Sequence, residues 1–213
     1  MKIGIIGASG KAGSAIMKEA KERGHEVAAI VRNASNVKDQ DVTVVEKDIF
    51  DLKAEDIKPF DAVVNAFGAP AGKEHLHVEA GKALISIFKE AKDTTLFVVG
   101  GAGSLFVDEA KTTRLAETPE FPKEYLQTAL QQAKNLQDLE NTESISWTFL
   151  SPAAMFDPNG KRTGAYKKGK DTLIVNDAGD SYISYADYAI AVLDELENPK
   201  HQNERFTVVG EAE

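Results

Sequence analysis

A glycine-rich loop at residues 7–13, GASGKAG, has the composition of a loop that binds phosphate groups. A P-loop for nucleoside triphosphates would require G-x-x-x-x-G-K-[ST]. If the pair Gly10-Lys11 ended such a motif, Ile5 would stand at the first glycine and Ala12 at the hydroxyl that binds the metal ion. Because both positions fail, we exclude phosphoryl transfer by this loop.

The same loop fits a dinucleotide-binding fingerprint of the form G-x-x-G-x-x-G, one residue longer than the commonest spacing. Gly7 permits a tight turn after a strand, Gly10 lets the backbone approach a pyrophosphate, and Gly13 permits close packing of helix and sheet. Amides at the start of the following helix then face the anion. A glycine-rich turn without a ligand is the alternative. The predicted contacts with the dinucleotide in this loop are Gly7, Ser9, Gly10, Lys11, Ala12 and Gly13.

The residue after the second predicted strand indicates which dinucleotide is bound. NAD-selective sites often carry an acidic residue there, which bonds the 2′-hydroxyl of the ribose. This chain has Arg32 at that place, and a guanidinium favours a 2′-phosphate. Lys11 adds a second positive charge. We therefore predict NADP as the coenzyme, with NAD possible; the alternative for Arg32 is a solvated surface arginine.

Two further strand ends supply candidate contacts. After the third run, Asp48 is predicted to accept a hydrogen bond from the adenine amino group, and Ile49 to lie against the ring. A turn aspartate is the alternative for Asp48. After the fourth run, the backbone of Ala66, Phe67 and Gly68 is predicted to pass close to the coenzyme ribose.

The elements that must position these residues follow from hydrophobic patterning. Between the apolar runs lie helical patterns at 13–23, 76–91 and 124–140, and a last helix begins near Ser184, which caps it, and ends before Pro199. Strand–helix alternation predicts an α/β fold of the Rossmann type, a doubly wound and mainly parallel sheet with helices on both faces. The seven runs, which have the composition of strands buried on both faces, are at 2–7, 27–31, 42–46, 61–67, 95–100, 146–150 and 205–210.

The chain is predicted to form a single domain over residues 1–213, with a substrate-side loop at 151–182. Its net charge of −9, from 34 acidic and 25 basic residues, argues against nucleic acid or an anionic membrane as a partner. The chain has no cysteine, no signal peptide and no apolar stretch long enough to span a membrane, so we expect a cytoplasmic protein. His75 and His77 are two residues apart, a spacing that does not favour a metal site.

The chain resembles a known family along nearly its whole length. The segments that carry the resemblance are GASGKAGSAI, IVRN, KDIFD, VVNAFGA, VVGGAGSL, FLSPAAMF, SYISYADYAIAVLDELENP and RFTVVG. They are similar to the atypical short-chain dehydrogenase/reductases, above all to single-domain NAD(P)H-binding proteins known as NADH-flavin reductases, which are related to biliverdin-IXβ reductase and NmrA-like proteins. The resemblance implies that the nicotinamide lies near Ala66-Phe67-Gly68 and Gly100-Gly101, and it supports the pyrophosphate, 2′-phosphate and adenine contacts predicted above.

The chain departs from the short-chain dehydrogenases at the catalytic pair. Those enzymes carry Tyr-x-x-x-Lys, in which the tyrosine gives a proton to the substrate oxygen. Here Leu130 stands four residues before Lys134, and Tyr125 stands nine before it. Ser104 remains in the loop after the fifth run. We take Ser104, as a substrate contact, and Lys134, as a contact with the coenzyme ribose, as the candidate catalytic residues; the alternatives are a loop serine and an exposed helix lysine.

These features predict an NADPH-dependent reductase of a small, flat, conjugated acceptor such as a flavin or a quinone, whose ring accepts hydride while solvent supplies the proton. Met155, Phe156 and Tyr166 are candidates to line an apolar pocket for that ring, or else ordinary packing residues. A redox sensor that holds NADP(H) without turnover is the second hypothesis. A sugar-nucleotide epimerase or dehydratase fits poorly, because the tyrosine is missing and the chain is short.

Overall fold

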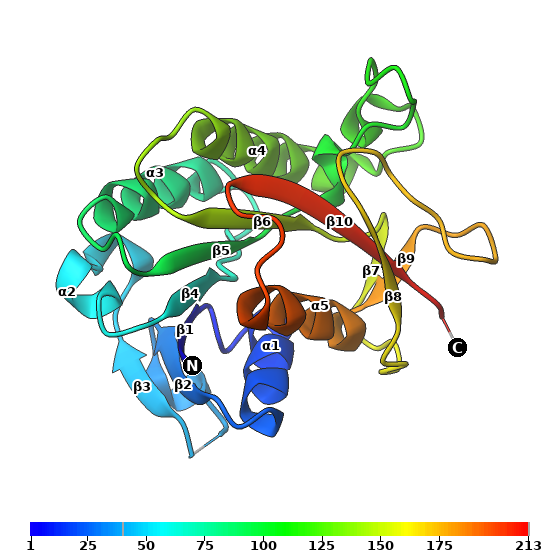
Figure 1. The fold of residues 1–213 in the computed structure, drawn as a ribbon. Coiled ribbons are helices and arrows are strands. Elements are labelled where there is room, and N and C mark those ends of the chain that lie inside the picture. Colours follow the sequence, from blue (N-terminus) through cyan, green and yellow to red (C-terminus); the bar gives the residue numbers. More distant parts are fainter. Residues whose placement is uncertain (40, 213) are drawn as a thin grey trace.

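The computed structural model describes residues 1–39 and 41–212. Its centre is an eight-stranded sheet in the order β3-β2-β1-β4-β5-β6-β10-β8, and a two-stranded parallel sheet, β7-β9, lies beside it (Figure 1). The strands are β1 (Lys2–Ile6), β2 (Glu26–Val31), β3 (Thr43–Glu46), β4 (Ala62–Asn65), β5 (Thr95–Val99), β6 (Trp147–Ser151), β7 (Met155–Asp157), β8 (Tyr166–Gly169), β9 (Tyr182–Ser184) and β10 (Glu204–Gly210).

The central sheet has the Rossmann topology that the sequence predicts. Every neighbouring pair in it is parallel except β10 with β8, which is antiparallel. The order reverses between β1 and β4, and in doubly wound sheets a ligand binds in the crevice beyond the carboxyl ends of the strands at such a point. The glycine loop at residues 7–13 follows β1 and therefore lies at this crevice.

Helices cover both faces of the sheet. They are α1 (Lys11–Glu22), α2 (Ala54–Ile57), α3 (Leu76–Phe88), α4 (Lys123–Glu140) and α5 (Tyr185–Glu197). Side chains of α1 and α5 pack on one face, and side chains of α3 and α4 pack on the other. Figure 1 shows these two helix pairs on opposite sides of the strands. The strands read as continuous apolar runs because both of their faces are buried.

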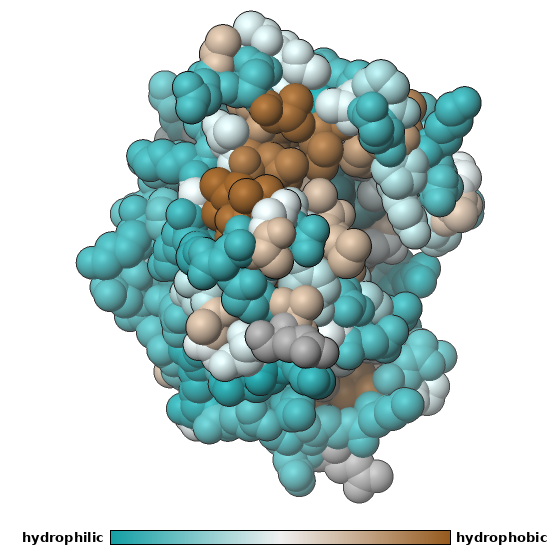
Figure 2. All heavy atoms as spheres, turned by 90° about the vertical axis from the view of Figure 1, so that its right-hand side faces the viewer, coloured by the Kyte–Doolittle hydropathy of each residue, from teal (hydrophilic) through white to brown (hydrophobic). Residues whose placement is uncertain are grey.

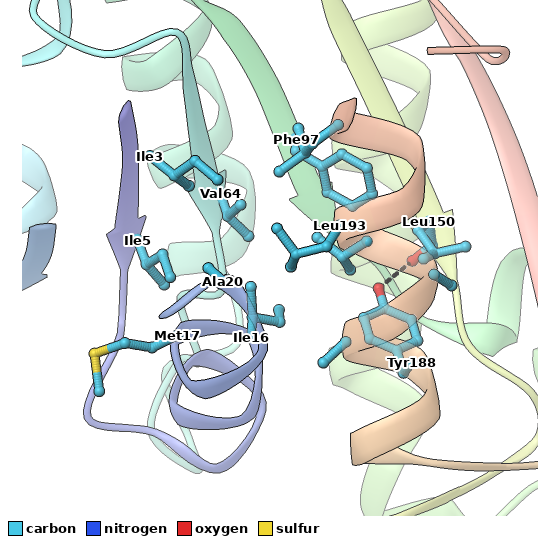
Figure 3. Close-up of a cluster of buried hydrophobic side chains, with 14 of the residues drawn as sticks. Ile3, Ile5, Ile16, Met17, Ala20, Val64, Phe97, Leu150, Tyr188 and Leu193 are labelled. Atoms are coloured by element: carbon cyan, nitrogen blue, oxygen red, sulfur yellow. Dashed lines mark hydrogen bonds between the residues drawn. The ribbon is translucent and has the colours of Figure 1, made fainter. Parts of the chain in front are cut away.

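The cluster under α1 and α5 shows how the core holds the first crossover in place. Ile16 and Met17 of α1 pack with Ile5 of β1, and Leu193 packs from α5 (Figure 3). Each fully buried side chain of this size stabilises the fold by about 1.5–3 kcal/mol. Tyr188 is completely buried in the same cluster, and its hydroxyl donates to the carbonyl oxygen of Leu150 at 2.7 Å. This bond satisfies the one polar atom of an otherwise apolar contact.

Segment 151–182, which the sequence predicts as an irregular loop, contains the short strands β7 and β8, ends at the start of β9 and is tied to the helices. Arg162 pairs with the buried carboxylate of Glu19 in α1. The buried carboxylate of Asp187 in α5 accepts from the backbone nitrogen and the hydroxyl of Thr163 and from the backbone nitrogen of Gly164. These contacts hold the segment against the α1–α5 face.

The last helix begins as the sequence predicts. The hydroxyl of Ser184 accepts from the backbone nitrogen of Asp187 at 3.0 Å, which caps the first turn of α5. Within the part of the chain that the structure describes, none of the helices combines the length and the apolar character that a membrane span requires.

Candidate functional site

Two glycines of the loop are required by the packing of the protein itself. Gly7 has φ +75°, a conformation that favours glycine, and a Cβ there would lie 2.6 Å from the carbonyl oxygen of Ala66. A Cβ on Gly13 would lie 2.3 Å from the carbonyl oxygen of Gly7. The turn therefore lies so close to the backbone after β4 and to the first turn of α1 that a side chain at either position would push the backbone apart.

Gly10 is different, because nothing inside the protein requires a glycine there. Its φ of −77° and ψ of 170° suit any residue, and a Cβ would meet only one atom within 4 Å, the carbonyl oxygen of Gly7 at 3.2 Å. Gly10 is also the N-cap of α1, whose first amides have no acceptor within the helix. The backbone at Gly10 is thus unobstructed and lies beside the first amides of α1, and a diphosphate could bind there.

The other predicted loop residues lie around this cradle. Ser9 and Lys11 are exposed and Ala12 is half-buried. The carbonyl oxygen of Lys11 accepts from the hydroxyl of Ser14 at 3.0 Å, inside the first turn of α1. The structure therefore gathers the glycine loop, one hydroxyl and one ammonium group at the carboxyl end of β1.

Arg32 follows β2 directly and is exposed. No carboxylate of residues 1–39 or 41–212 lies within ion-pair distance of its guanidinium. The nearby carboxylate of Glu46, at the end of β3, accepts instead from the backbone nitrogen of Ala34 at 2.7 Å. Arg32 thus has a geometry that suits a ligand phosphate, and its role stays a prediction.

The two predicted adenine contacts, Asp48 and Ile49, both make contacts within the protein. Asp48 caps the short 3₁₀ helix η2 (Ile49–Asp51), and its carboxylate accepts from the backbone nitrogen of Phe50 at 3.0 Å. Ile49 is buried in the core, so little of its side chain is available to a ring. The exposed apolar side chain at this turn is Phe50, which the sequence reasoning passed over although it follows Ile49 directly.

Phe67 stands at the end of β4 between two rings. Its ring lies edge-on to Phe50, at 6.4 Å, and to His77, at 5.7 Å. His77 is buried, and burial lowers the pKa of its imidazole. Its Nε2 accepts from the backbone nitrogen of Ala69 at 3.4 Å, which requires a neutral ring. His77 therefore supports the 66–69 backbone, and a Cβ built on Gly68 would meet no described atom within 4 Å, so the backbone there is open.

The two candidate catalytic residues have different surroundings. Ser104 ends the 3₁₀ helix η3 (Ala102–Ser104) and is 5% exposed. Its hydroxyl accepts from Nη1 of Arg205 at 3.0 Å, in a buried polar cluster on the α4 face of the sheet. Lys134 is exposed on α4 and makes no hydrogen bond to the described residues. The predicted contact of Ser104 with a substrate therefore finds no support in this geometry.

Gln132, which the sequence reasoning missed, lies at the end of β5 instead. A Cβ on Gly101 would meet its Oε1 at 2.1 Å, so this side chain lies directly on the backbone that follows β5. Thr128 stands one helical turn earlier, on the same face of α4. Thr128 and Gln132 have the same i, i+4 spacing as the tyrosine and lysine of the usual catalytic pair. This spacing of two polar residues is the signal in the sequence that points to Gln132.

The residues proposed to line an acceptor pocket separate into two groups. Met155 is 61% exposed, and the ring of Phe156 lies 3.9 Å, centroid to centroid, from that of Tyr185. Burial, together with the nearby Tyr125, raises the pKa of Tyr185. Tyr166 does not belong with them, because its hydroxyl donates to Asp194 of α5 at 2.7 Å. The aromatic surface available to a ring is therefore at the β7–α5 junction.

Hydrophobic residues also gather on the face of the molecule toward which β10 runs. Figure 2 shows one such patch in the upper half of that face, with hydrophilic residues around it. Over the described ranges, no group of three or more histidine, aspartate or glutamate side chains is placed to hold a metal ion.

The fold and the loop define a Rossmann-type dinucleotide-binding protein. The family model of NAD(P)H-binding proteins matches residues 7–199, so the chain belongs to the NAD(P)H-binding family. The coenzyme it holds is therefore a nicotinamide dinucleotide.

Known proteins are similar to the chain over its full length. YwnB of Bacillus subtilis (strain 168) is 78% identical, with 100% of both chains covered. The crystal structure of SP1627 from Streptococcus pneumoniae TIGR4, described as "a putative NADH-flavin reductase", has 44% identity and a TM-score of 0.94, with 99% of this chain and 100% of that one covered. A "putative epimerase" from Bacteroides thetaiotaomicron has 40% identity and a TM-score of 0.84, with 98% and 96% covered.

Proposed function

We propose that the protein is an NAD(P)H-dependent oxidoreductase that prefers NADPH and transfers hydride to a flat, conjugated acceptor such as a flavin or a quinone. Membership of the NAD(P)H-binding family and the 44% identity with SP1627 support a reductase. The observation that carries the proposal is the open backbone at Gly10, which internal packing leaves free and a pyrophosphate would use.

The chain would hold the coenzyme by groups spread over three strand ends. Amides at the start of α1 face the pyrophosphate, and Arg32 faces the 2′-phosphate of the adenosine. Gln132, on the backbone after β5, and the 66–68 backbone after β4 flank the place where the nicotinamide half would lie. When bound, the reduced nicotinamide supplies a hydride.

The proposed class of hydride acceptor is based on the lack of a tyrosine proton donor in the site. Reduction of an isolated carbonyl needs a proton donor beside the oxygen, and Leu130 replaces the tyrosine of the usual pair. Ser104 is 5% exposed, and its hydroxyl lies in the Arg205 cluster on the α4 face. A conjugated ring spreads the negative charge it receives and takes its proton from solvent, so it needs no such donor. The apolar surface at Met155 and Phe156 suits a flat ring.

A sensor that binds NADP(H) without turnover is the second candidate, favoured by Leu130 in place of a tyrosine four residues before Lys134. The experiment mixes the purified protein with NADPH and follows the absorbance of the reduced nicotinamide with FMN, FAD or a quinone present. Oxidation that depends on both protein and acceptor supports the reductase. Tight NADPH binding without oxidation across the acceptor panel would refute turnover and leave the sensor.

A further inference from the structure

A polar cavity of about 280 Å³ lies on the α4 face of the sheet, away from the glycine loop. The C-terminal half of α4, the start of β10 and the segment after η3 enclose it. At about 30 Å³ per water molecule, the volume corresponds to roughly nine waters, enough for a small organic molecule. None of the contacts described for the nicotinamide coenzyme uses this space.

The floor of the cavity is a buried arginine with donors to spare. Arg205 is 7% exposed, and its Nε donates to Asp171 at 3.0 Å. Nη1 donates to the hydroxyls of Ser104, at 3.0 Å, and Ser151, at 3.3 Å. An arginine has five N–H donors, so these bonds leave the two on Nη2. Within the described chain no acceptor bonds Nη2, and Arg205 lines the cavity.

A second guanidinium faces the same space. Arg114 lines the cavity and lies 5.6 Å from the ring centroid of Phe106, which fixes it as a cation–π pair. Lys111 also lines the cavity, but its ammonium pairs with Asp171 at 2.9 Å. The carboxylate of Asp171 is thus shared by two cations, and their hydrogen bonds outweigh the effect of burial and lower its pKa.

The charges around the cavity do not cancel. Three cations, Arg205, Arg114 and Lys111, face two carboxylates, Asp171 and Glu140. Among the residues that line the cavity, positive charges therefore outnumber negative ones by one, in a chain whose net charge is −9. A local excess of positive charge on an acidic protein attracts an anion, and a guanidinium matches the planar or tetrahedral oxygen arrangement of a carboxylate or a phosphate.

We propose that this cavity binds a small oxyanion, a carboxylate or phosphate compound, between the guanidinium groups of Arg205 and Arg114. The residues that line the cavity include none of the predicted coenzyme contacts at 7–13, 32, 48–49 or 66–68. The volume of the cavity limits the ligand to a small molecule.

The test follows the backbone amide signals of the ¹⁵N-labelled protein by NMR during titration with sodium acetate or sodium phosphate. Sodium chloride at matched ionic strength is the reference. We expect saturable shifts at Ser104, Phe106 and Arg114. Saturation by acetate alone would assign the site to carboxylates, and saturation by phosphate alone would assign it to phosphates.

Two variants separate this site from the coenzyme loop. Arg114→Gln, at an exposed position that tolerates the change, should weaken the anion at least about tenfold by removing a charged hydrogen-bond donor. Arg32→Gln should leave the shifts at Ser104 and Phe106 unchanged. The absence of saturable shifts at these amides, shifts confined to residues 7–13, or wild-type affinity in Arg114→Gln would each overturn the proposal.

Discussion

Replacing Gly10 with alanine is expected to weaken coenzyme binding while leaving the fold nearly intact. The φ and ψ of Gly10 suit alanine, and the added methyl would meet one carbonyl oxygen at 3.2 Å, which a shift of a few tenths of an ångström relieves. Glycine is also the better N-cap, so the change should cost about 1 kcal/mol of stability. In a chain of this size that lowers the melting temperature by about 2–4 °C.

The effect on binding should be much larger. The methyl would stand where a pyrophosphate oxygen approaches the amides at the start of α1. Losing one charge-assisted hydrogen bond costs about 1.5–3 kcal/mol, which corresponds to a dissociation constant raised about 10- to 100-fold. Isothermal titration calorimetry with NADPH measures the affinity, and differential scanning fluorimetry measures the melting temperature of the same sample.

Gly13→Ala is the matched control for a steric effect on the fold. Its Cβ would lie 2.3 Å from the carbonyl oxygen of Gly7 and within 2.9 Å of two further backbone atoms, so the turn itself must move. We expect a loss of about 3 kcal/mol of stability together with the loss of binding. If Gly10→Ala bound NADPH as the wild type does, the loop would not hold the pyrophosphate, and the central assumption about this site would be wrong.

Four further outcomes follow from the structure. Arg32→Gln should raise the dissociation constant of NADPH about tenfold or more and that of NADH less than about twofold, because only NADPH carries the 2′-phosphate; equal losses by calorimetry would contradict the assignment. The pKa of His77 is lower in the fold than its unfolded value of about 6.5, so its contribution to stability is complete above that pH and is lost as the pH falls. Urea unfolding should show that the free energy of unfolding falls by at most about 1.4 kcal/mol per pH unit below that pH, and His77→Gln should make the free energy depend less on pH. Asp187→Asn should cost about 3 kcal/mol in urea unfolding, since its buried carboxylate accepts from three donors and an amide turns a donor toward them. Gln132→Ala should raise the KM for NADPH while Lys134→Ala leaves it within about twofold; the reverse order in steady-state kinetics would support the ribose contact predicted for Lys134.

The fold was predictable because its signals are local. Seven valine- and isoleucine-rich runs, separated by helical stripes, admit few arrangements other than a parallel sheet covered on both faces. The glycine loop was equally clear, since a turn from a strand into a helix imposes its requirements on consecutive residues. The cap at Ser184 is also a local signal, because the hydroxyl and the amide that donates to it are three residues apart.

The candidate catalytic residues were harder to predict because their positions depend on which face of an element meets which neighbour. Lys134 and Gln132 are two residues apart on α4, which places them about 200° apart around the helix. Only the packing of α4 on the sheet decides that Gln132 reaches Gly101 and that Lys134 faces solvent. The partner of Ser104, Arg205, lies 101 residues away in the chain, beyond the reach of any local pattern.

The anchoring of segment 151–182 bears directly on how an acceptor reaches the coenzyme. Moving this segment would separate Arg162 from Glu19, whose side chain is 5% exposed, and would leave a buried carboxylate with a single partner, Arg23. The buried carboxylate of Glu19 would lose one of its two cationic partners, and the three hydrogen bonds to Asp187 would be lost as well. A loop that opens in every catalytic cycle needs a smaller difference between its two states. The segment therefore has the properties of a fixed wall, and an acceptor that enters beside β7 meets a surface already in place.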